Sequence, residues 1–305
     1  MCILLDLPDE LLVQVFSWIH PSKVFKFRRL SKRMDALLSS KHFAHRDLIQ
    51  AFGQPGQAST ILQHSDITSF FFFAPLAVQN AFAGGYGHMY DEMKLRTKVH
   101  RSYALPPSIS HFKNLVRLNI TGLCGSIPSE IGSLSHLQEL IITDSPSLTP
   151  APFPEAIGNI GGLVRLGMSF CNLTGPFPRA VCRLANLEFM SLCHNNLYGP
   201  VPSAIESLVN LRTFGVQCNE LSGSIPEELG DLVNLKCLYL GGNKFSGNIP
   251  ASLGNLEDLE TLVAYDNQLE GFVPIEFQNL VNLQECDLSG NSDLSCEFDF
   301  SVLEI

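Results

Sequence analysis

Long hydrophobic runs are missing from this chain. The longest apolar stretch, residues 70–78, spans nine residues and contains Pro75, whereas a helix that crosses a bilayer needs about 20 apolar residues. The start of the sequence has no basic leader and no small-residue cleavage site, because Asp6 directly follows the apolar residues 3–5. The sequence therefore predicts no membrane span, no membrane partner and no secretory signal.

Paired cysteines are missing as well. The nine cysteines are scattered singly, without the paired spacing typical of disulfide-capped extracellular proteins. This favours a reducing compartment, the cytoplasm and/or the nucleus. The triplets Asn119-Ile-Thr121 and Asn172-Leu-Thr174 match N-glycosylation acceptors, so an extracellular location is the alternative.

Basic residues are scarce in the larger part of the chain. Residues 105–305 carry 8 basic and 22 acidic side chains, whereas residues 1–104 carry 12 basic and 8 acidic ones. The formal net charges of the two parts are therefore −14 and +4. Such a change of composition along a chain indicates two joined modules.

Residues 163–282 repeat one pattern, LxxLxLxxNxLxGxxPxxxxxLxx, with a period of 24. The copies begin at Leu163, Leu187, Leu211, Leu235 and Leu259. Leucines at alternating positions, such as Leu238 and Leu240, predict that each copy opens with a short strand that has one buried face. One unit cannot close a core alone, so stacked neighbours are expected to form a curved solenoid with a parallel sheet inside.

An asparagine column and a turn follow the strand in each unit. The column contains Asn195, Asn219, Asn243, Asn267 and Asn291, with Cys171 in the same position of an earlier copy. A carboxamide has two donated hydrogens and an acceptor, so these side chains are expected to tie together the backbones of adjacent coils. Gly247 and Pro250 then turn the chain before Leu253 and Leu256 return inward.

These units resemble the leucine-rich repeat, specifically its plant-type 24-residue subtype with an LxGxIP turn, as in residues 221–235 and 245–259. Looser copies at 115–136, 137–162 and 283–305 are what terminal repeats should look like. The resemblance implies an α/β fold over residues 105–305: a leucine-rich-repeat solenoid with a parallel β-sheet on its concave face.

Residues 1–52 have a different pattern, that of several short amphipathic helices. Pro8 lies near the expected start of the first helix, and Leu11, Leu12, Val15 and Phe16 fall on one of its faces. A module of this size buries too little surface to cover its own apolar stripes, and we therefore expect it to bind a partner. Eight basic residues against one acidic residue in 23–46 leave nucleic acid as an alternative, but no DNA-reading motif accompanies them.

Leu7-Pro8-Asp9-Glu10 and the segment RRLSKR at 28–33 resemble an F-box, with Met34 where that family usually has tryptophan. The resemblance implies a small all-α module that binds the Skp-type adaptor of a cullin ubiquitin ligase. The adaptor-binding residues that it implies are Leu7, Pro8, Leu11, Leu12, Val15 and Phe16. The implied function is the substrate-recognition subunit of an SCF-type ligase, whose repeats bind a target protein. The alternative is a non-catalytic leucine-rich-repeat scaffold or signalling adaptor unrelated to ubiquitin.

The segment between the two modules, residues 53–104, is rich in aromatic residues. Phe82, Tyr86 and Tyr90 make it too apolar for a free linker, and we expect it to be an N-terminal cap that packs over the first coil of the solenoid.

The concave face is the expected site for a target protein. Cations at Arg117, Arg165, Arg212 and Lys236 suggest a pocket for an acidic or phosphorylated segment. Glutamates at neighbouring positions of the sheet favour mutual neutralisation instead. Together with exposed aromatic residues, the predicted contact residues are Arg165, Phe189, His194, Arg212, Tyr239 and Tyr265.

No catalytic set emerges from the sequence. Cys193 and His194 are neighbours in a predicted strand, so their side chains should point apart, which separates a nucleophile from its base. His42 and His45 have no carboxylate or cysteine at metal-ligand spacing. We therefore expect no enzyme activity, no metal and no cofactor, with an enzyme that uses Cys193 as the distant alternative.

Overall fold

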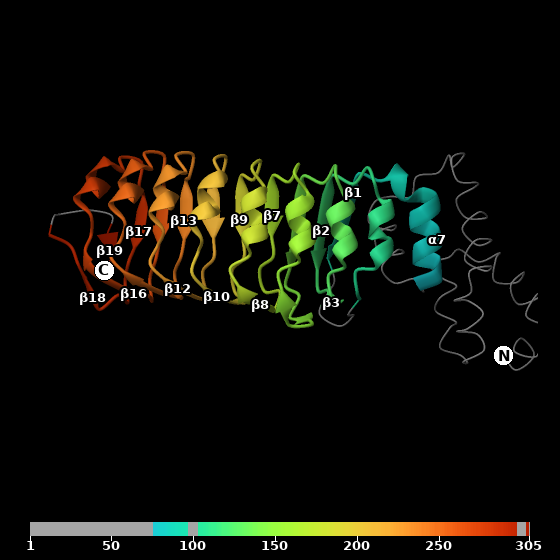
Figure 1. The fold of residues 1–305 in the computed structure, drawn as a ribbon, viewed down its shortest axis with the longest axis horizontal. Coiled ribbons are helices and arrows are strands. Elements are labelled where there is room, and N and C mark those ends of the chain that lie inside the picture. Colours follow the sequence, from blue (N-terminus) through green and yellow to red (C-terminus); the bar gives the residue numbers. More distant parts are fainter. Residues whose placement is uncertain (1–75, 97–102, 298–302, 305) are drawn as a thin grey trace, which may run out of the picture.

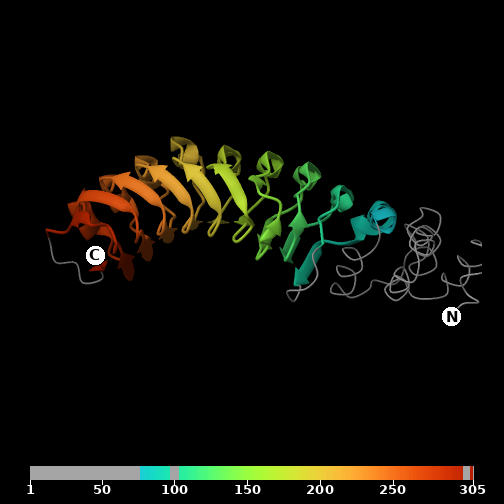
Figure 2. The same cartoon turned by 90° about the horizontal axis from the view of Figure 1, so that it is seen from below.

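The computed structural model describes residues 76–96, 103–297, 303 and 304. The predictions for residues 1–52, including Leu7, Pro8, Leu11, Leu12, Val15 and Phe16, therefore lie outside the described residues. The described chain winds into successive coils that stack along one axis (Figure 1). Seen from below, the stack is an arc with strands on its inner side and short helices on its outer side (Figure 2). The predicted solenoid with a parallel sheet on the concave face is confirmed.

The inner side of the arc is one long sheet whose described strands are all parallel and follow the order of the chain. These ten strands are β1 (Glu92–Arg96), β2 (Arg117–Thr121), β4 (Glu139–Thr143), β7 (Arg165–Gly167), β9 (Phe189–Ser191), β11 (Thr213–Gly215), β13 (Cys237–Tyr239), β15 (Thr261–Val263), β17 (Glu285–Asp287) and β19 (Leu303–Glu304). From β7 to β17 each residue pairs with the one 24 positions later, as Thr213 does with Cys237. The register therefore follows the sequence period.

The outer side of the arc consists of five-residue 3₁₀ helices, each preceded directly by a proline. They are η3 (Pro107–His111), η4 (Ser129–Ser133), η5 (Glu155–Asn159), η6 (Arg179–Arg183), η7 (Ser203–Ser207), η8 (Glu227–Asp231), η9 (Ala251–Asn255) and η10 (Ile275–Asn279). The proline fixes φ for the turn and lacks the N–H that would have no partner at a helix start. The third residue of each helix, such as Leu229 in η8, is fully buried.

A second sheet closes one side of the coils, along the lower edge of Figure 1. Its described strands are β6 (Ala151–Pro152), β8 (Leu173–Pro176), β10 (Asn196–Gly199), β12 (Glu220–Gly223), β14 (Lys244–Gly247), β16 (Gln268–Phe272) and β18 (Asp293–Ser295). A short pair, β3 (Cys124–Gly125) and β5 (Ser147–Leu148), takes this place in earlier coils. Gly223 and Gly247 end their strands with φ of 82° and 77°, a conformation that glycine adopts without strain.

The core lies between these layers as columns of apolar side chains. Leu235, Leu238 and Leu253, from the strand and the helix of one coil, are all 0% exposed, and the same positions are buried in the neighbouring coils. Burying one leucine side chain contributes roughly 1.5–3 kcal/mol. Since every coil packs on two neighbours, the stack shares one continuous core.

The asparagine column forms the predicted ladder. Asn243 Oδ1 accepts the backbone N–H of Leu221 in the previous coil at 3.0 Å. Its Nδ2 donates to the carbonyl of Val216, also in that coil, at 3.1 Å and to the carbonyl of Leu240 in its own coil at 2.9 Å. The equivalent bonds recur at Asn195, Asn219, Asn267 and Asn291. Each carboxamide thus binds the backbones of two coils in the buried interior.

Shorter side chains replace asparagine at the start of the ladder. Cys171 occupies the predicted position, where its thiol donates to the carbonyl of Ile142 at 3.0 Å. Ser145 fills the position before it: its hydroxyl accepts the N–H of Leu123 at 3.0 Å and donates to the carbonyl of Thr143 at 2.9 Å. The sequence pattern did not reveal Ser145, because serine replaces the asparagine that marks the column, although Ser145 follows Leu137 at the same spacing as Asn243 follows Leu235.

Helix α7 (Leu76–Tyr86) and η2 (Gly87–Met89) cover the first coil. Phe82 is fully buried, stacks on Tyr86 and Tyr90, and lies 6.4 Å from the ring of Phe112 beside η3. These aromatic residues thus pack on the solenoid as expected. The strand half of the first coil, which the sequence did not reveal, is β1, upstream of the expected solenoid start at residue 105. The boundaries of 53–104 and 105–305 stay a prediction.

Replacing Asn243 by alanine should destabilise the chain by about 2–4 kcal/mol, because a buried N–H and two buried carbonyls lose their partner. Chemical denaturation followed by circular dichroism measures this loss. Asn234→Ala is the matched control: its Nδ2 also donates to a carbonyl of the previous coil, that of Val209 at 2.8 Å, but at an exposed site. Its cost should stay below about 1 kcal/mol, and equal losses in both variants would contradict a buried ladder.

Candidate functional site

The inner sheet displays its outward residues in regular rows across the strands. In β2, Leu118 and Ile120 are buried while Arg117, Asn119 and Thr121 face outward, as the alternation of a strand requires. The register of the strands then fixes which residues are neighbours. One row contains Glu92, Arg117, Glu139, Arg165, Phe189, Thr213, Cys237, Thr261 and Glu285.

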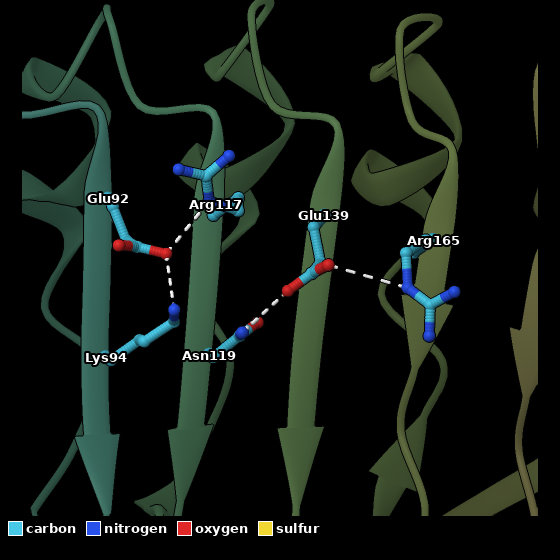
Figure 3. A network of polar contacts seen from close by, with 6 residues as sticks. All are labelled: Glu92, Lys94, Arg117, Asn119, Glu139 and Arg165. Atoms are coloured by element: carbon cyan, nitrogen blue, oxygen red, sulfur yellow. Dashed lines mark hydrogen bonds and ion pairs between the residues drawn. The ribbon is translucent and has the colours of Figure 1, made fainter.

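The first part of this face is a network of opposite charges (Figure 3). Glu92 pairs with Lys94 on its own strand at 2.7 Å and with Arg117 on the next strand at 2.8 Å. Hydrogen bonds from Lys94 and Arg117, with their positive charges, lower the pKa of the Glu92 carboxyl although partial burial opposes them. Glu139 accepts from Asn119 Nδ2 at 2.6 Å and pairs with Arg165 at 3.5 Å. Every charge drawn in Figure 3 thus has a partner of opposite sign.

Two more ion pairs lie at the positions directly before the strands. Arg212 pairs with Glu188 at 3.5 Å, and Lys236 pairs with Glu260 at 2.6 Å. The predicted mutual neutralisation is therefore confirmed, and these cations do not form a free basic pocket. Because the partners are about half exposed and screened by solvent, each pair contributes little to stability.

Arg165 and Phe189, two of the predicted contact residues, touch each other. The guanidinium carbon of Arg165 lies 4.4 Å from the centre of the Phe189 ring, a cation–π contact. Arg165 thus covers one face of an aromatic ring that the sequence suggested would be exposed, and Phe189 is half-buried.

His194, another predicted contact residue, stacks on Phe170 of the previous coil. Their ring centres are 4.1 Å apart and the rings are almost parallel, at 10°. Both residues have a positive φ, 53° and 55°, which is unusual for bulky side chains. Phe170 is 47% exposed. The sequence pattern did not reveal Phe170; its position one residue before the asparagine column, where the coils turn sharply, is the signal that could have identified it.

Tyr239 and Tyr265 lie on the C-terminal part of the inner face, and both are half-buried. The ring of Tyr265 lies so close to Gly241 that a Cβ there would be 2.6 Å from Cε1 of the ring. Burial, a hydrogen bond with Cys237 and the nearby charge of Glu285 raise the pKa of the Tyr239 hydroxyl. A contact with the Cys218 thiol, followed by burial, raises the pKa of Tyr265.

The six predicted contact residues do not form one patch. Arg165, Phe189 and His194 lie on or just after β7 and β9, whereas Tyr239 and Tyr265 lie on or just after β13 and β15. Strand β11 separates the two groups: its Thr213 is half-buried, and its Phe214 and Gly215 are buried. Arg212 lies at the start of β11 and is engaged with Glu188. Their role in binding stays a prediction.

Cys193 and His194 lie just after β9 and not in a strand as predicted, but their side chains diverge as expected. Cys193 is buried and its thiol donates to Gln217 Oε1 at 2.7 Å, whereas His194 is exposed and stacks on Phe170. Burial raises the pKa of the Cys193 thiol, the opposite of what activates a nucleophile. Within 76–96, 103–297, 303 and 304, no three histidine, cysteine or acidic side chains gather as metal ligands would. In the same residues, no helix is long and apolar enough to span a bilayer.

Comparison with known sequences identifies two domain families. The F-box domain family matches residues 4–46, and the Leucine Rich Repeat family matches residues 186–208 and 234–256. Both are typically non-catalytic interaction modules, and no enzyme family is indicated. Among curated proteins, no sequence matches the chain.

Solved structures similar to the chain are leucine-rich-repeat proteins. The ectodomain of the Arabidopsis thaliana receptor kinase GASSHO1/SCHENGEN3, in complex with CASPARIAN STRIP INTEGRITY FACTOR 2, has a TM-score of 0.61 and 29% identity, covering 67% of this chain and 24% of that one. The Arabidopsis HAESA ectodomain, in complex with an IDA peptide hormone ligand, has a TM-score of 0.62 and 31% identity, and the match covers 67% of this chain and 33% of that one. A Leptospira interrogans leucine-rich-repeat protein has a TM-score of 0.56 and 30% identity, and the match covers 65% of this chain and 52% of that one. The chain thus spans a quarter to a half of their lengths.

The stacked coils, the asparagine ladder and these similarities define a leucine-rich-repeat protein of the plant-type 24-residue subtype. The chain thus combines a match to the F-box domain family at residues 4–46 with C-terminal leucine-rich repeats.

Replacing Glu92 by glutamine tests the charge network. The folded-state pKa of Glu92 lies below its unfolded value, so its charge stabilises the fold above that value and loses this effect as pH falls through the folded pKa. At pH 7 the variant should be less stable by up to about 1 kcal/mol, since Arg117 and Lys94 are half exposed. The difference from the parent chain should shrink below about pH 4. Thermal unfolding at several pH values measures it, with the exposed Glu257→Gln as control; a pH-independent difference would contradict the ion pairs.

Proposed function

We propose that this chain is the substrate-recognition subunit of an SCF-type cullin ubiquitin ligase. In this proposal the F-box domain binds the Skp-type adaptor, and the leucine-rich repeats bind a target protein. The observation that carries the proposal is the presence in one chain of an F-box domain, at residues 4–46, and a leucine-rich-repeat solenoid.

The residues of the F-box segment support the adaptor as partner. F-box domains generally bind Skp1-type adaptors. Leu7 and Pro8 match the start of the F-box pattern, and Leu11, Leu12, Val15 and Phe16 follow at helical spacing. An apolar stripe of this kind in so short a module is expected to be covered by another polypeptide.

The solenoid supports the binding of a protein target. Its inner sheet offers half-buried aromatic side chains, Phe189, Tyr239 and Tyr265, on a rigid frame, and such residues often anchor protein interfaces. The similar ectodomains of GASSHO1/SCHENGEN3 and HAESA, each solved in complex with a ligand, support a binding role for stacked repeats of this subtype.

The chain would perform no chemistry itself in this function. By binding adaptor and target at once, it would turn the encounter between the target and the ubiquitin-charged enzyme into an effectively intramolecular event. The buried and hydrogen-bonded Cys193 is consistent with a non-catalytic role. We place this function in the cytoplasm and/or the nucleus, because the cysteines are scattered singly.

The double variant Leu11→Asp with Leu12→Asp tests the adaptor interaction. Two charges on the apolar stripe should reduce binding of the purified Skp-type adaptor by the full-length chain at least 100-fold, since buried unpaired carboxylates are strongly unfavourable. Isothermal titration calorimetry measures the affinity.

Val233→Asp with Val281→Asp is the matched control, because these valines are 58% and 80% exposed on the outer side of the coils. This pair adds the same charge and should leave adaptor binding unchanged. If the parent chain fails to bind the adaptor, or if the leucine variant binds as well as the control, the chain is a leucine-rich-repeat scaffold unrelated to ubiquitin.

A further inference from the structure

The inner sheet face changes character along the solenoid. In its first coils, Glu92 and Glu139 pair with cations of the same or the neighbouring strand (Figure 3). The last cations of the chain are also engaged: Lys236 pairs with Glu260, and Lys244 pairs with Glu220 on the second sheet. After Lys244 the sequence contains 12 acidic residues and no lysine, arginine or histidine. The coils at the C-terminal end of this face therefore contribute no positively charged side chain.

Three carboxylates on these last coils lie outside every ion pair of the described residues. Asp266 and Glu285 are exposed, and Asp287 is half-buried. Glu285 and Asp287 are two residues apart on β17, so they project from the same face of the strand about 7 Å apart. Among the described residues, the Asp287 carboxylate accepts hydrogen bonds only from Ser289, from the backbone N–H at 3.0 Å and from the hydroxyl at 2.6 Å. These bonds orient the Asp287 carboxylate but do not neutralise it.

Two tyrosines border these carboxylates. The register places Tyr239 in one row with Val263 and Asp287, across three neighbouring strands. Tyr265 directly precedes Asp266, and its ring lies on the backbone of Gly241. Since the missing side chain at Gly241 lets the ring lie low on the sheet, Tyr265 forms part of the floor of this surface. We call Tyr239, Tyr265, Asp266, Glu285 and Asp287 the tyrosine–carboxylate surface.

An aromatic face beside unpaired carboxylates is suited to a cationic side chain. A guanidinium or ammonium group gains cation–π attraction from a tyrosine ring and a charge-assisted hydrogen bond from a carboxylate at once. A phosphorylated or acidic segment would be repelled by the same carboxylates. Arg165 shows this combination within the chain, because its guanidinium lies over the Phe189 ring and pairs with the Glu139 carboxylate.

We propose that the tyrosine–carboxylate surface is the docking site for an arginine- or lysine-containing segment of the target protein. This inference deepens the proposed function, on which it rests for the identity of the partner as a ligase target.

Fluorescence anisotropy with a defined probe tests the proposal. The probe is a labelled peptide of alternating glycine and arginine with three arginines, added to the full-length chain at low salt. The variant Glu285→Gln with Asp287→Asn, which keeps the shape of both side chains, should weaken binding at least 10-fold. Gly241→Ala, which displaces the Tyr265 ring, should weaken it at least 3-fold.

The matched control is Glu257→Gln with Glu276→Gln, which removes two exposed carboxylates from the outer side of the same coils. This control should change the affinity by less than 2-fold, and a peptide with glutamate in place of arginine should not bind. An equal loss in both double variants would mean attraction by net charge alone and would overturn the proposal. Absence of binding by the arginine peptide, or equal binding of the glutamate peptide, would overturn it as well.

Adaptor binding separates this proposal from the proposed function. Glu285→Gln with Asp287→Asn should bind the Skp-type adaptor like the parent chain, and Leu11→Asp with Leu12→Asp should bind the arginine peptide like the parent chain. If the adaptor does not bind while the peptide does, the docking surface stands and the ligase role fails. If the adaptor binds and the peptide does not, the ligase role stands and the docking surface is wrong.

Discussion

The buried carboxamide that joins each coil to the one before it is the constraint on which the rest of this structure depends. Backbone groups just after the inner sheet and in the second sheet, such as the Val216 carbonyl and the Leu221 N–H, point into the buried interior, where they bond to asparagine side chains. Asn219 and Asn243 supply the missing acceptor and donors. Because an unsatisfied buried polar group costs about 1–3 kcal/mol, a coil of the wrong length would lose this match. The ladder thus favours a constant period of 24, and the constant period sets the rows of the inner face.

Those rows determine what the inner face can bind. With strands about 4.8 Å apart, side chains of adjacent coils contact each other whether or not a partner is present. In the first coils this proximity neutralises opposite charges, as between Glu139 and Arg165, and leaves little net field. In the last coils the neighbours of Glu285 and Asp287 on β15 are the uncharged Thr261 and Val263, and the neighbour of Asp287 on β19 is the acidic Glu304, so their negative charge stays available to a partner. The inner face therefore has a first part whose charges pair with each other and a last part whose carboxylates can bind a cationic ligand.

Periodic features of this fold could be predicted from the sequence, whereas features that occur once could not. The repeat fixed the strands, the ladder and the pairing of Lys236 with Glu260, because equivalent positions of stacked coils must be neighbours. Strand β1 was missed because Glu92–Arg96 alternates charged with apolar residues over too few positions to show a period. Phe170 was missed because its exposure follows from a positive φ at the turn, and the sequence marks that turn with glycine only in other coils, as at Gly242. The separation of the aromatic residues into two groups depends on which coils carry them, those of β7 and β9 or those of β13 and β15.

Residue-resolved hydrogen exchange of the full chain tests the ladder most directly. The backbone amides of Leu197, Leu221, Phe245 and Leu269 donate to asparagine side chains of the next coil rather than to backbone carbonyls. These four amides lie 24 residues apart along the chain. If the asparagine side chains hold the coils together, all four should exchange as slowly as amides within the inner sheet. Exchange as fast as that of exposed turns would contradict the account, because the coils would then be held by apolar packing alone.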